Sequence, residues 1–147
     1  MTSMKSMKRM AVLSMVTAGV YVSAMVVVSA QAKTASSGVY SAAQAKRGEG
    51  VYKEQCAACH GDNLEGSGPM PPLAGKDFLA NWGGKPVAEV FDKTQTSMPA
   101  TAPGSLTPEQ TADVISYLLS VGKYPAGSAD LPGKADDLKQ ITLDAPK

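Results

Sequence analysis

The sequence predicts an all-α domain of three main helices joined by loops. Three segments carry apolar residues at helical spacing next to capping residues, and the stretches between them are rich in proline and glycine. Beyond the first 32 residues, alternating runs of β-branched residues are almost absent, which argues against a large sheet. No internal repeat or low-complexity tract is present, so we expect one folded domain over residues 42–122.

Residues 1–32 have the pattern of an export signal. Basic residues come first, an apolar stretch over residues 10–28 follows, and Ala30-Gln31-Ala32 supplies small residues for cleavage. The apolar stretch is longer than a usual signal core, so an uncleaved membrane anchor over residues 10–28 is the alternative. In both cases the folded part lies outside the cytoplasm. We therefore expect a periplasmic protein that contacts a membrane only if the leader is retained.

The first helix is predicted over residues 42–55. It follows a small, polar segment, residues 33–41, whose composition is typical of a flexible lead-in. Ser41 is suited to cap the helix at its N-terminus. A glycine inside a helix costs about 1 kcal/mol relative to alanine, so Gly48 indicates that another backbone comes close there. Tyr52 lies on the same face of the helix.

A shorter helix is predicted over residues 86–95, where Val87 and Val90 belong to an apolar face. Beyond the domain, the C-terminal tail, residues 123–147, holds two Pro/Gly turns and one short helical pattern over residues 134–141. The sequence assigns no role to this tail.

The clearest helix begins after Thr107. Thr107 and Gln110 form a capping box, Pro108 occupies the first helical position, and Gly122 supplies the stop. The apolar stripe of this helix consists of Val114, Tyr117, Leu118 and Val121. We expect the stripe to pack on the Gly48 face of the first helix, because a small residue opposite a ring lets two helices cross closely.

The pentapeptide Cys56-Ala57-Ala58-Cys59-His60 has the C-x-x-C-H spacing of covalent haem attachment. On one helical turn the two thiols lie on one side, where they can bond the vinyl groups of a haem, and the histidine can ligate the iron. The alternative is a redox-active dithiol of the thioredoxin-like type, but such a site needs alternating strands and helices. His60 therefore favours one haem c, bound through Cys56 and Cys59.

Met98 is the predicted second axial ligand. His60 is the only histidine, and Met70 and Met98 are the only methionines outside the leader. Met98 lies far enough beyond His60 to reach the other haem face, and Pro99 favours an extended backbone that would hold the sulfur in place. Met70 lies close to His60 among prolines and is expected to line the near side of the pocket. A sixth position that is open or filled by water is the remaining alternative.

Three further residues are candidates for contacts in the haem site. A ligand histidine usually donates its other ring proton to a fixed acceptor, and the carbonyl of Pro71 or Pro72 is our candidate. The alternative is that these prolines only stiffen a surface loop. Trp82 either donates its indole N–H to a buried haem propionate or is ordinary core.

Composition limits both the partners and the sources of stability. Cleavage of the leader would remove three of the 14 basic residues and none of the 13 acidic ones, which gives a formal charge of −2. No basic patch then remains to bind nucleic acid. Both cysteines belong to the motif, so no disulfide is available, and a buried haem would complete a modest core. We therefore expect the apoprotein to be poorly folded.

Residues 42–121 resemble the small monohaem class I cytochromes c. The likeness rests on the Gly48 and Tyr52 helix, the C-x-x-C-H motif, Pro71-Pro72-Leu73, Trp82, Met98-Pro99 and the Tyr117 helix, all in the family order. The resemblance implies that the first and last helices cross near the haem edge. More narrowly, residues 63–68, 71–75 and 98–104 look like the haem domains that accompany quinoprotein alcohol dehydrogenases. Met70, inserted among the prolines, departs from the usual run.

The leading function is that of a one-electron carrier rather than an enzyme. With both axial positions filled, the iron can change oxidation state but cannot readily bind a substrate. The expected partners are respiratory dehydrogenases and oxidases, met in brief and weak encounters. Two alternatives remain: a permanent haem subunit of a quinoprotein dehydrogenase, and a peroxidase-like or gas-binding haem protein with a vacant sixth position.

Overall fold

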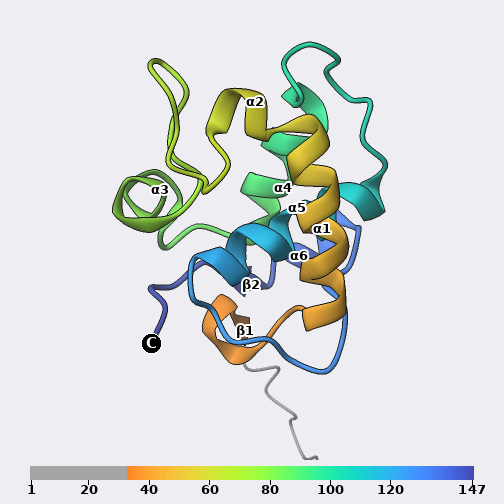
Figure 1. Cartoon of the computed structure of the whole chain (residues 1–147). Coiled ribbons are helices and arrows are strands. Elements are labelled where there is room, and N and C mark those ends of the chain that lie inside the picture. The colour runs from red at the N-terminus through yellow and green to blue at the C-terminus, as the bar shows by residue number, and fades with distance from the viewer. Residues whose placement is uncertain (1–32) are drawn as a thin grey trace, which may run out of the picture. The chain divides into compact units, whose positions relative to one another are not determined.

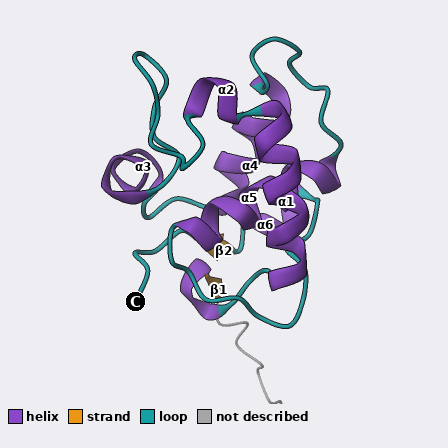
Figure 2. Ribbon diagram, in the orientation of Figure 1, coloured by secondary structure: helices purple, strands orange, loops and turns teal. Residues whose placement is uncertain are grey.

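The computed structural model of the 147-residue chain describes residues 33–147 (Figure 1). This part is almost entirely helical, with one small sheet, as Figure 2 shows. Its helices are α1 (Ala42–Gln55), α2 (Ala57–His60), α3 (Gly75–Trp82), α4 (Val87–Ser97), α5 (Pro108–Val121) and α6 (Ala135–Leu138), together with the 3-10 helix η1 (Ala35–Ser37). Strands β1 (Lys33–Thr34) and β2 (Ile141–Thr142) pair in parallel.

The predicted all-α class is confirmed, although the sequence did not predict the small sheet. Each strand has two residues, too few to show a period-two pattern in the sequence. The predicted export signal or membrane anchor lies outside the described residues. Within residues 33–147, no helix has both the length and the apolar character needed to cross a membrane.

Helices α1 and α5 begin and end where the sequence predicts. The side-chain oxygen of Ser41 accepts a hydrogen bond from the N–H of Gln44, which caps α1. At the start of α5, Thr107 and Gln110 form the reciprocal hydrogen bonds of the capping box. Both helices therefore satisfy part of their free N–H groups through residues next to them in the chain.

The close crossing of α1 and α5 depends on a glycine. A Cβ atom on Gly48 would lie 1.8 Å from the carbonyl oxygen of Asp113, so any larger residue would push the helices apart. One turn further along α1, the ring of Tyr52 packs against that of Tyr117 with 5.3 Å between centroids. The predicted packing of the α5 stripe on the Gly48 face is confirmed.

The other two long helices differ in how well the sequence predicts them. Helix α4 begins just after Pro86, as expected, and extends two residues past the predicted end at residue 95. Helix α3 was not predicted. It begins without a side-chain cap and buries only Phe78, so it lacks the local features that identify α1 and α5.

The segment over residues 33–41 is folded, which corrects the expectation of a flexible lead-in. It contains β1 and η1, and its Ala35 and Tyr40 are 0% and 2% exposed. The hydroxyl of Tyr40 donates to the carbonyl oxygen of Tyr124 at 2.7 Å. Because these partners come from the distant tail, the local composition of the segment does not reveal them.

The C-terminal tail is joined to both central helices. Gln44 of α1 is 2% exposed and binds the backbone of Leu131 twice: its Nε2 donates to the carbonyl oxygen at 2.9 Å and its Oε1 accepts from the N–H at 2.6 Å. Arg47 binds Asp113 of α5 through two contacts of 3.0 Å and reaches Asp130 of the tail at 2.8 Å. The tail therefore forms part of the domain.

Buried apolar side chains form two clusters. The tail-side cluster consists of Ala35, Tyr40, Ala45, Phe78, Val87, Ala88, Val90, Phe91, Ala112, Ile115, Leu119, Tyr124, Leu131, Leu138, Ile141 and Leu143. The motif-side cluster consists of Tyr52, Leu64, Val114 and Leu118, with partly buried neighbours that include Cys56 and Leu73. The terminal segments thus supply much of the larger cluster, whereas the smaller one lies beside the C-x-x-C-H motif.

Candidate functional site

The C-x-x-C-H residues lie on the short helix that follows α1. Cys56 interrupts the helical backbone with φ −125°, and α2 carries the rest of the motif. The N–H groups of Cys59 and His60 both point to the carbonyl oxygen of Cys56, at 3.1 and 3.0 Å. One turn therefore holds both thiols and the imidazole, the arrangement that covalent haem attachment needs.

The loop after α2 folds back onto His60. The N–H of Gly66 donates to the carbonyl oxygen of His60 at 2.8 Å. Gly66 has φ +78°, and a Cβ atom there would lie 2.6 Å from the carbonyl oxygen of Met70, so both conformation and space require glycine. This return of the chain brings Pro71 beside the histidine ring.

The orientation of His60 is fixed by Pro71. Nδ1 of His60 lies 2.9 Å from the carbonyl oxygen of Pro71. A carbonyl can only accept, so Nδ1 carries the proton and donates it, and Nε2 keeps the lone pair that can ligate a metal. Pro72, the other candidate acceptor, makes no such bond in the described structure and does not line the pocket.

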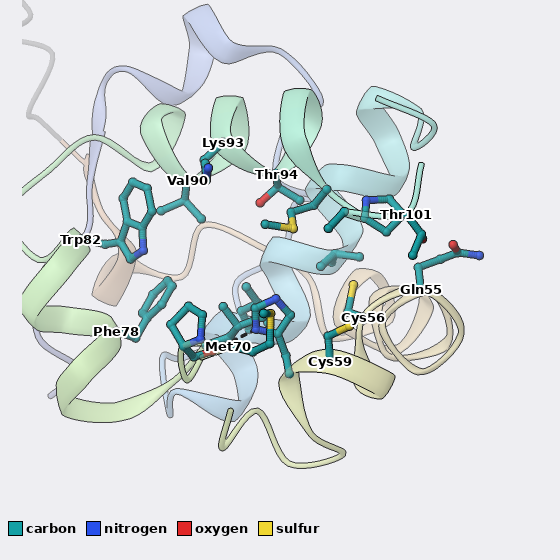
Figure 3. Close-up of a pocket in the computed structure, with 18 residues that line it drawn as sticks. Gln55, Cys56, Cys59, Met70, Phe78, Trp82, Val90, Lys93, Thr94 and Thr101 are labelled. Carbon is teal, nitrogen blue, oxygen red and sulfur yellow. Dashed lines mark hydrogen bonds between the residues drawn. The ribbon is translucent and has the colours of Figure 1, made fainter. Parts of the chain in front are cut away.

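An open pocket adjoins the motif and is lined by residues of α2, α3, α4 and α5. Figure 3 shows the side chains of Cys56 and Cys59 at one end of this pocket and those of Phe78 and Trp82 at the other, with Val90 of α4 along one wall. Most lining residues are apolar, as is usual for sites that bind cofactors.

Both methionines of the described chain line the pocket, but they come from different elements. Met98 directly follows α4, with the extended backbone (φ −122°, ψ 152°) that Pro99 predicts, and the peptide bond between them is cis. Met70 is 36% exposed and precedes Pro71 in the loop that contacts His60. Met70 therefore belongs to the histidine side of the pocket. Ligation by Met98 stays a prediction.

Trp82 lies between the pocket and the tail-side cluster. It ends α3, lines the pocket and also packs against the tail-side cluster. The ammonium group of Lys85 lies 5.2 Å from the centroid of its ring, within the range of a cation–π contact. A hydrogen bond from the indole to a haem propionate stays a prediction.

Several residues that line the pocket were not among those predicted from the sequence. Lys93 and Thr94 line the pocket together with Val90, which was part of the predicted apolar face. Because they lie three and four residues after Val90, the helical spacing could have found them. Phe78 was missed for a different reason, since the helix that carries it was not predicted.

The pKa of the Cys56 thiol argues against redox-active dithiol chemistry at the motif. Burial, with a smaller effect of the neighbouring Cys59, raises the pKa of the Cys56 thiol to about 11. A redox-active cysteine needs the opposite, a lowered pKa that supplies thiolate at neutral pH. Next to the motif, the hydroxyl of Tyr52 donates to the carbonyl oxygen of Gly61 at 2.6 Å, and burial raises its pKa, so it stays a neutral donor.

The residues present fit a haem. Two thiols at one end can hold its vinyl edge, and His60 offers an unprotonated Nε2 with a fixed ring orientation. Met98 supplies a thioether from the end of α4, and the mainly apolar walls match the macrocycle.

Comparison with known proteins identifies relatives of the region that forms this site. Residues 43–118 match the family described as cytochrome C oxidase, cbb3-type, subunit III. The chain is 31% identical over 109 residues to the cbb3-type cytochrome c oxidase subunit FixP of Sinorhizobium medicae (strain WSM419). The alignment covers 66% of this chain and 35% of that protein. The chain is also 34% identical over 87 residues to the dehydrogenase subunit of the alcohol dehydrogenase (quinone) of Gluconobacter oxydans (strain 621H). This alignment covers 54% of this chain and 11% of that subunit.

A solved structure has a similar fold. The sulfane dehydrogenase SoxCD of Paracoccus pantotrophus contains a chain that matches with a TM-score of 0.54 and 25% identity, over 67% of this chain and 52% of that chain. This chain thus spans about a third or less of the two relatives above and about half of this structural neighbour. The matched residues 43–118 contain the cysteines, His60 and Met98.

Proposed function

We propose that this chain, which belongs to the cytochrome c family, is a periplasmic one-electron carrier between respiratory dehydrogenases and terminal acceptors. Proteins of this family bind covalent haem c and transfer electrons without being enzymes themselves. Relatives of this chain are components of oxidase and dehydrogenase complexes. These relatives support partners of the same kind for this chain.

The observation that carries the proposal is that two side chains suited to ligate iron line one pocket from two different elements. His60 comes from α2 and Met98 from the end of α4, and both line the pocket. A haem bound here supplies one iron that takes up and releases a single electron. With an imidazole and a thioether committed to the iron, no position is left for a substrate. The soft sulfur of Met98 favours the ferrous state and raises the reduction potential.

Other residues keep this coordination in place. Pro71 fixes the ring of His60 through the 2.9 Å hydrogen bond, and the extended backbone at Met98 directs its side chain. Cys56 and Cys59 tether the cofactor, so it stays with the protein during each encounter. The apolar walls keep water away from the iron ligands, which suits rapid electron transfer with little reorganisation.

Substitution of Met98 by alanine tests the ligand assignment. In haem-loaded Met98→Ala we expect a high-spin spectrum, loss of the methionine-to-iron charge-transfer band and a lowered reduction potential, because the thioether no longer stabilises ferrous iron. Met70→Ala is the matched control, since Met70 lines the same pocket from the histidine side, and it should leave spectrum and potential nearly unchanged. A wild-type spectrum in Met98→Ala would refute the assignment.

A second candidate is a permanent haem subunit of a quinoprotein dehydrogenase. The 34% identity to the Gluconobacter oxydans dehydrogenase subunit, over 54% of this chain, favours it. Size-exclusion chromatography of the protein from its native membranes and periplasm separates the two functions. A carrier elutes at its own mass, whereas a subunit elutes with a larger quinoprotein partner.

A further inference from the structure

The loop that begins with Met98 is attached at both ends to the last turn of α4. Residues 98–106 lead from α4 towards α5 and carry Met98, which lines the pocket. At the start of this loop, the N–H of Met98 donates to the carbonyl oxygen of Thr94 at 3.0 Å. At its end, Nε2 of Gln95 donates to the carbonyl oxygen of Leu106 at 2.6 Å. Two neighbouring residues of α4 therefore close residues 98–106, which we call the Met98 loop.

The middle of the Met98 loop has few attachments of its own. Residues 100–105 are all exposed, whereas Pro99 near the start and Leu106 at the end are buried. Two backbone hydrogen bonds within the loop join its own residues to one another. Among residues 33–147, Gln95 provides the one side chain outside the loop that forms a hydrogen bond with it. The position of the far end of the loop therefore depends on Gln95 and on the burial of Leu106.

The amide of Gln95 is held in one orientation by a buried hydroxyl of α5. The carbonyl oxygen of Leu106 can only accept, so the NH₂ group of Gln95 faces it and Oε1 faces Thr111. Thr111 is 0% exposed, and its hydroxyl donates to Oε1 of Gln95 at 2.8 Å. The carbonyl oxygen of Thr107 is a more distant acceptor for the same hydroxyl, at 3.1 Å. Helix α5 thus orients the side chain that closes the loop.

We infer that Gln95 is a positioning residue for Met98, because its amide keeps the Met98 loop closed and thereby favours ligation of the iron by the sulfur. This inference rests on the proposed ligation of iron by Met98. Releasing one end of the loop would give the chain around Met98 more conformational freedom, which favours the state without the ligand. Gln95 is not among the residues that line the pocket in the described structure, so it acts on the iron through the loop. An added ligand that displaces the sulfur must then also break the hydrogen bond of Gln95.

Cyanide binding to the ferric, haem-loaded protein measures how readily Met98 leaves the iron. Cyanide takes the place of the sulfur, so its binding abolishes the methionine-to-iron charge-transfer band. In Gln95→Ala the loop opens without losing this hydrogen bond. The apparent affinity for cyanide should therefore rise about three- to tenfold, the range that one hydrogen bond supplies. Titration of the absorbance with potassium cyanide at a fixed pH gives the affinity of each protein.

Gln44→Ala is the matched control for a general loss of stability. Gln44 also donates from its amide to a backbone carbonyl oxygen, but its partner, Leu131, belongs to the tail. This variant loses the same kind of hydrogen bond without touching the Met98 loop. Its affinity for cyanide should stay within about twofold of the wild type, since separate sites act nearly independently.

A second pair of variants tests the orientation of the Gln95 amide. Thr111→Val removes the hydroxyl that donates to Gln95 and nearly preserves the size of the side chain, so the affinity for cyanide should rise by a smaller factor. Thr111→Ser keeps a hydroxyl at this position and should bind cyanide as the wild type does. The pair leaves the Gln95 side chain itself unchanged.

The outcomes separate the role of Gln95 from the ligation by Met98. Equal cyanide affinities in Gln95→Ala and Gln44→Ala would overturn the positioning role of Gln95 and leave the carrier function intact. If Gln95→Ala does not bind haem, equal affinities in Thr111→Val and Thr111→Ser would overturn that role in the same way. A wild type that lacks the methionine-to-iron band before cyanide is added would overturn the ligation by Met98 and this inference together.

Discussion

The tail-side cluster and the motif-side cluster differ in what completes them. The first is built from many buried side chains of both terminal segments and four helices, with Ala35 and Leu138 at 0% exposure. The second has four buried members and adjoins the open pocket beside the motif. The second needs a cofactor to fill the space beside it, whereas only Phe78, Val90 and the partly buried Trp82 of the first border that space. The domain is therefore stabilised in two ways: by protein packing in the tail-side cluster and by cofactor binding beside the motif-side cluster.

This comparison refines the expectation that the apoprotein is poorly folded. That expectation places the haem at the centre of the whole core. The tail, however, supplies buried side chains to the tail-side cluster. With Gln44 bound to Leu131 and Arg47 to Asp130, the tail-side region has its own packing and hydrogen bonds. We now expect loss of haem to affect the motif side far more than the tail side.

Removing the haem should have the largest effect on local stability. It directly tests whether the two clusters differ in their need for the cofactor. In protein produced without haem attachment, amide hydrogens of α2 and of residues 61–74 should exchange at rates close to those of an unfolded chain. Amides of α5 and β2 should remain protected by at least about 100-fold, because their packing does not need the cofactor. Hydrogen exchange followed by mass spectrometry measures both regions in one sample. Uniform loss of protection would show that the two clusters form one cooperative unit.

Substituting Gln44 should weaken the tail-side region by a smaller amount. Gln44→Ala leaves the buried N–H and carbonyl of Leu131 without partners, which should lower the free energy of unfolding by roughly 1–3 kcal/mol. Gln55→Ala is the matched control on the same helix, because Gln55 is exposed and should change stability by less than about 0.5 kcal/mol. Urea unfolding of the haem-loaded variants gives both values. If both substitutions lowered the free energy of unfolding equally, the contacts of Gln44 with Leu131 would not be a specific source of stability.

The smallest expected effect concerns the pH dependence of the contact between the tail and α1. Hydrogen bonds from Ser41 and then Arg47 lower the pKa of Asp130 below its usual value. A lowered folded-state pKa adds stability above the unfolded value of about 3.9, and this stability is lost as the pH falls through the folded value. Because Asp130 is half-exposed, the gain should stay under about 1 kcal/mol.

Asp130→Asn isolates this contribution. The difference in urea midpoint between wild type and Asp130→Asn should be present at pH 6 and shrink as the pH falls below about 4, since asparagine does not titrate. The haem absorbance, which reports the motif side, should not follow the same profile. A difference that stays constant with pH would rule out the ionised carboxylate as its source.

Local features of the sequence predict the parts of the fold that are stabilised locally. The bounds of α1 and α5 follow from Ser41 and from the Thr107 capping box, which act within one turn of each helix. Gly48 predicts the close crossing because a glycine inside a helix needs a reason in packing. The spacing of Cys56, Cys59 and His60 places all three on one turn without any tertiary information.

The remaining features depend on contacts between distant residues. Strand β1 pairs with β2 from the other end of the described chain, and two residues show no pattern of their own. Leu131 and Leu138 are both buried, but each stands alone in the sequence and shows no helical or strand periodicity. The choice of Pro71 over Pro72 depends on how the loop returns at Gly66, which the order of the prolines does not specify.

The parallel pairing of Lys33 with Ile141 brings the two ends of the described chain together. This pairing lies near the beginning of α1, whereas Cys56 follows the end of that helix, which at 14 residues is about 20 Å long (Figure 1). A tag, an electrode linker or a neighbouring module attached next to either strand would therefore be held on the face opposite the tethered edge. Immobilised in this way, the molecule would keep its electrochemically active side free.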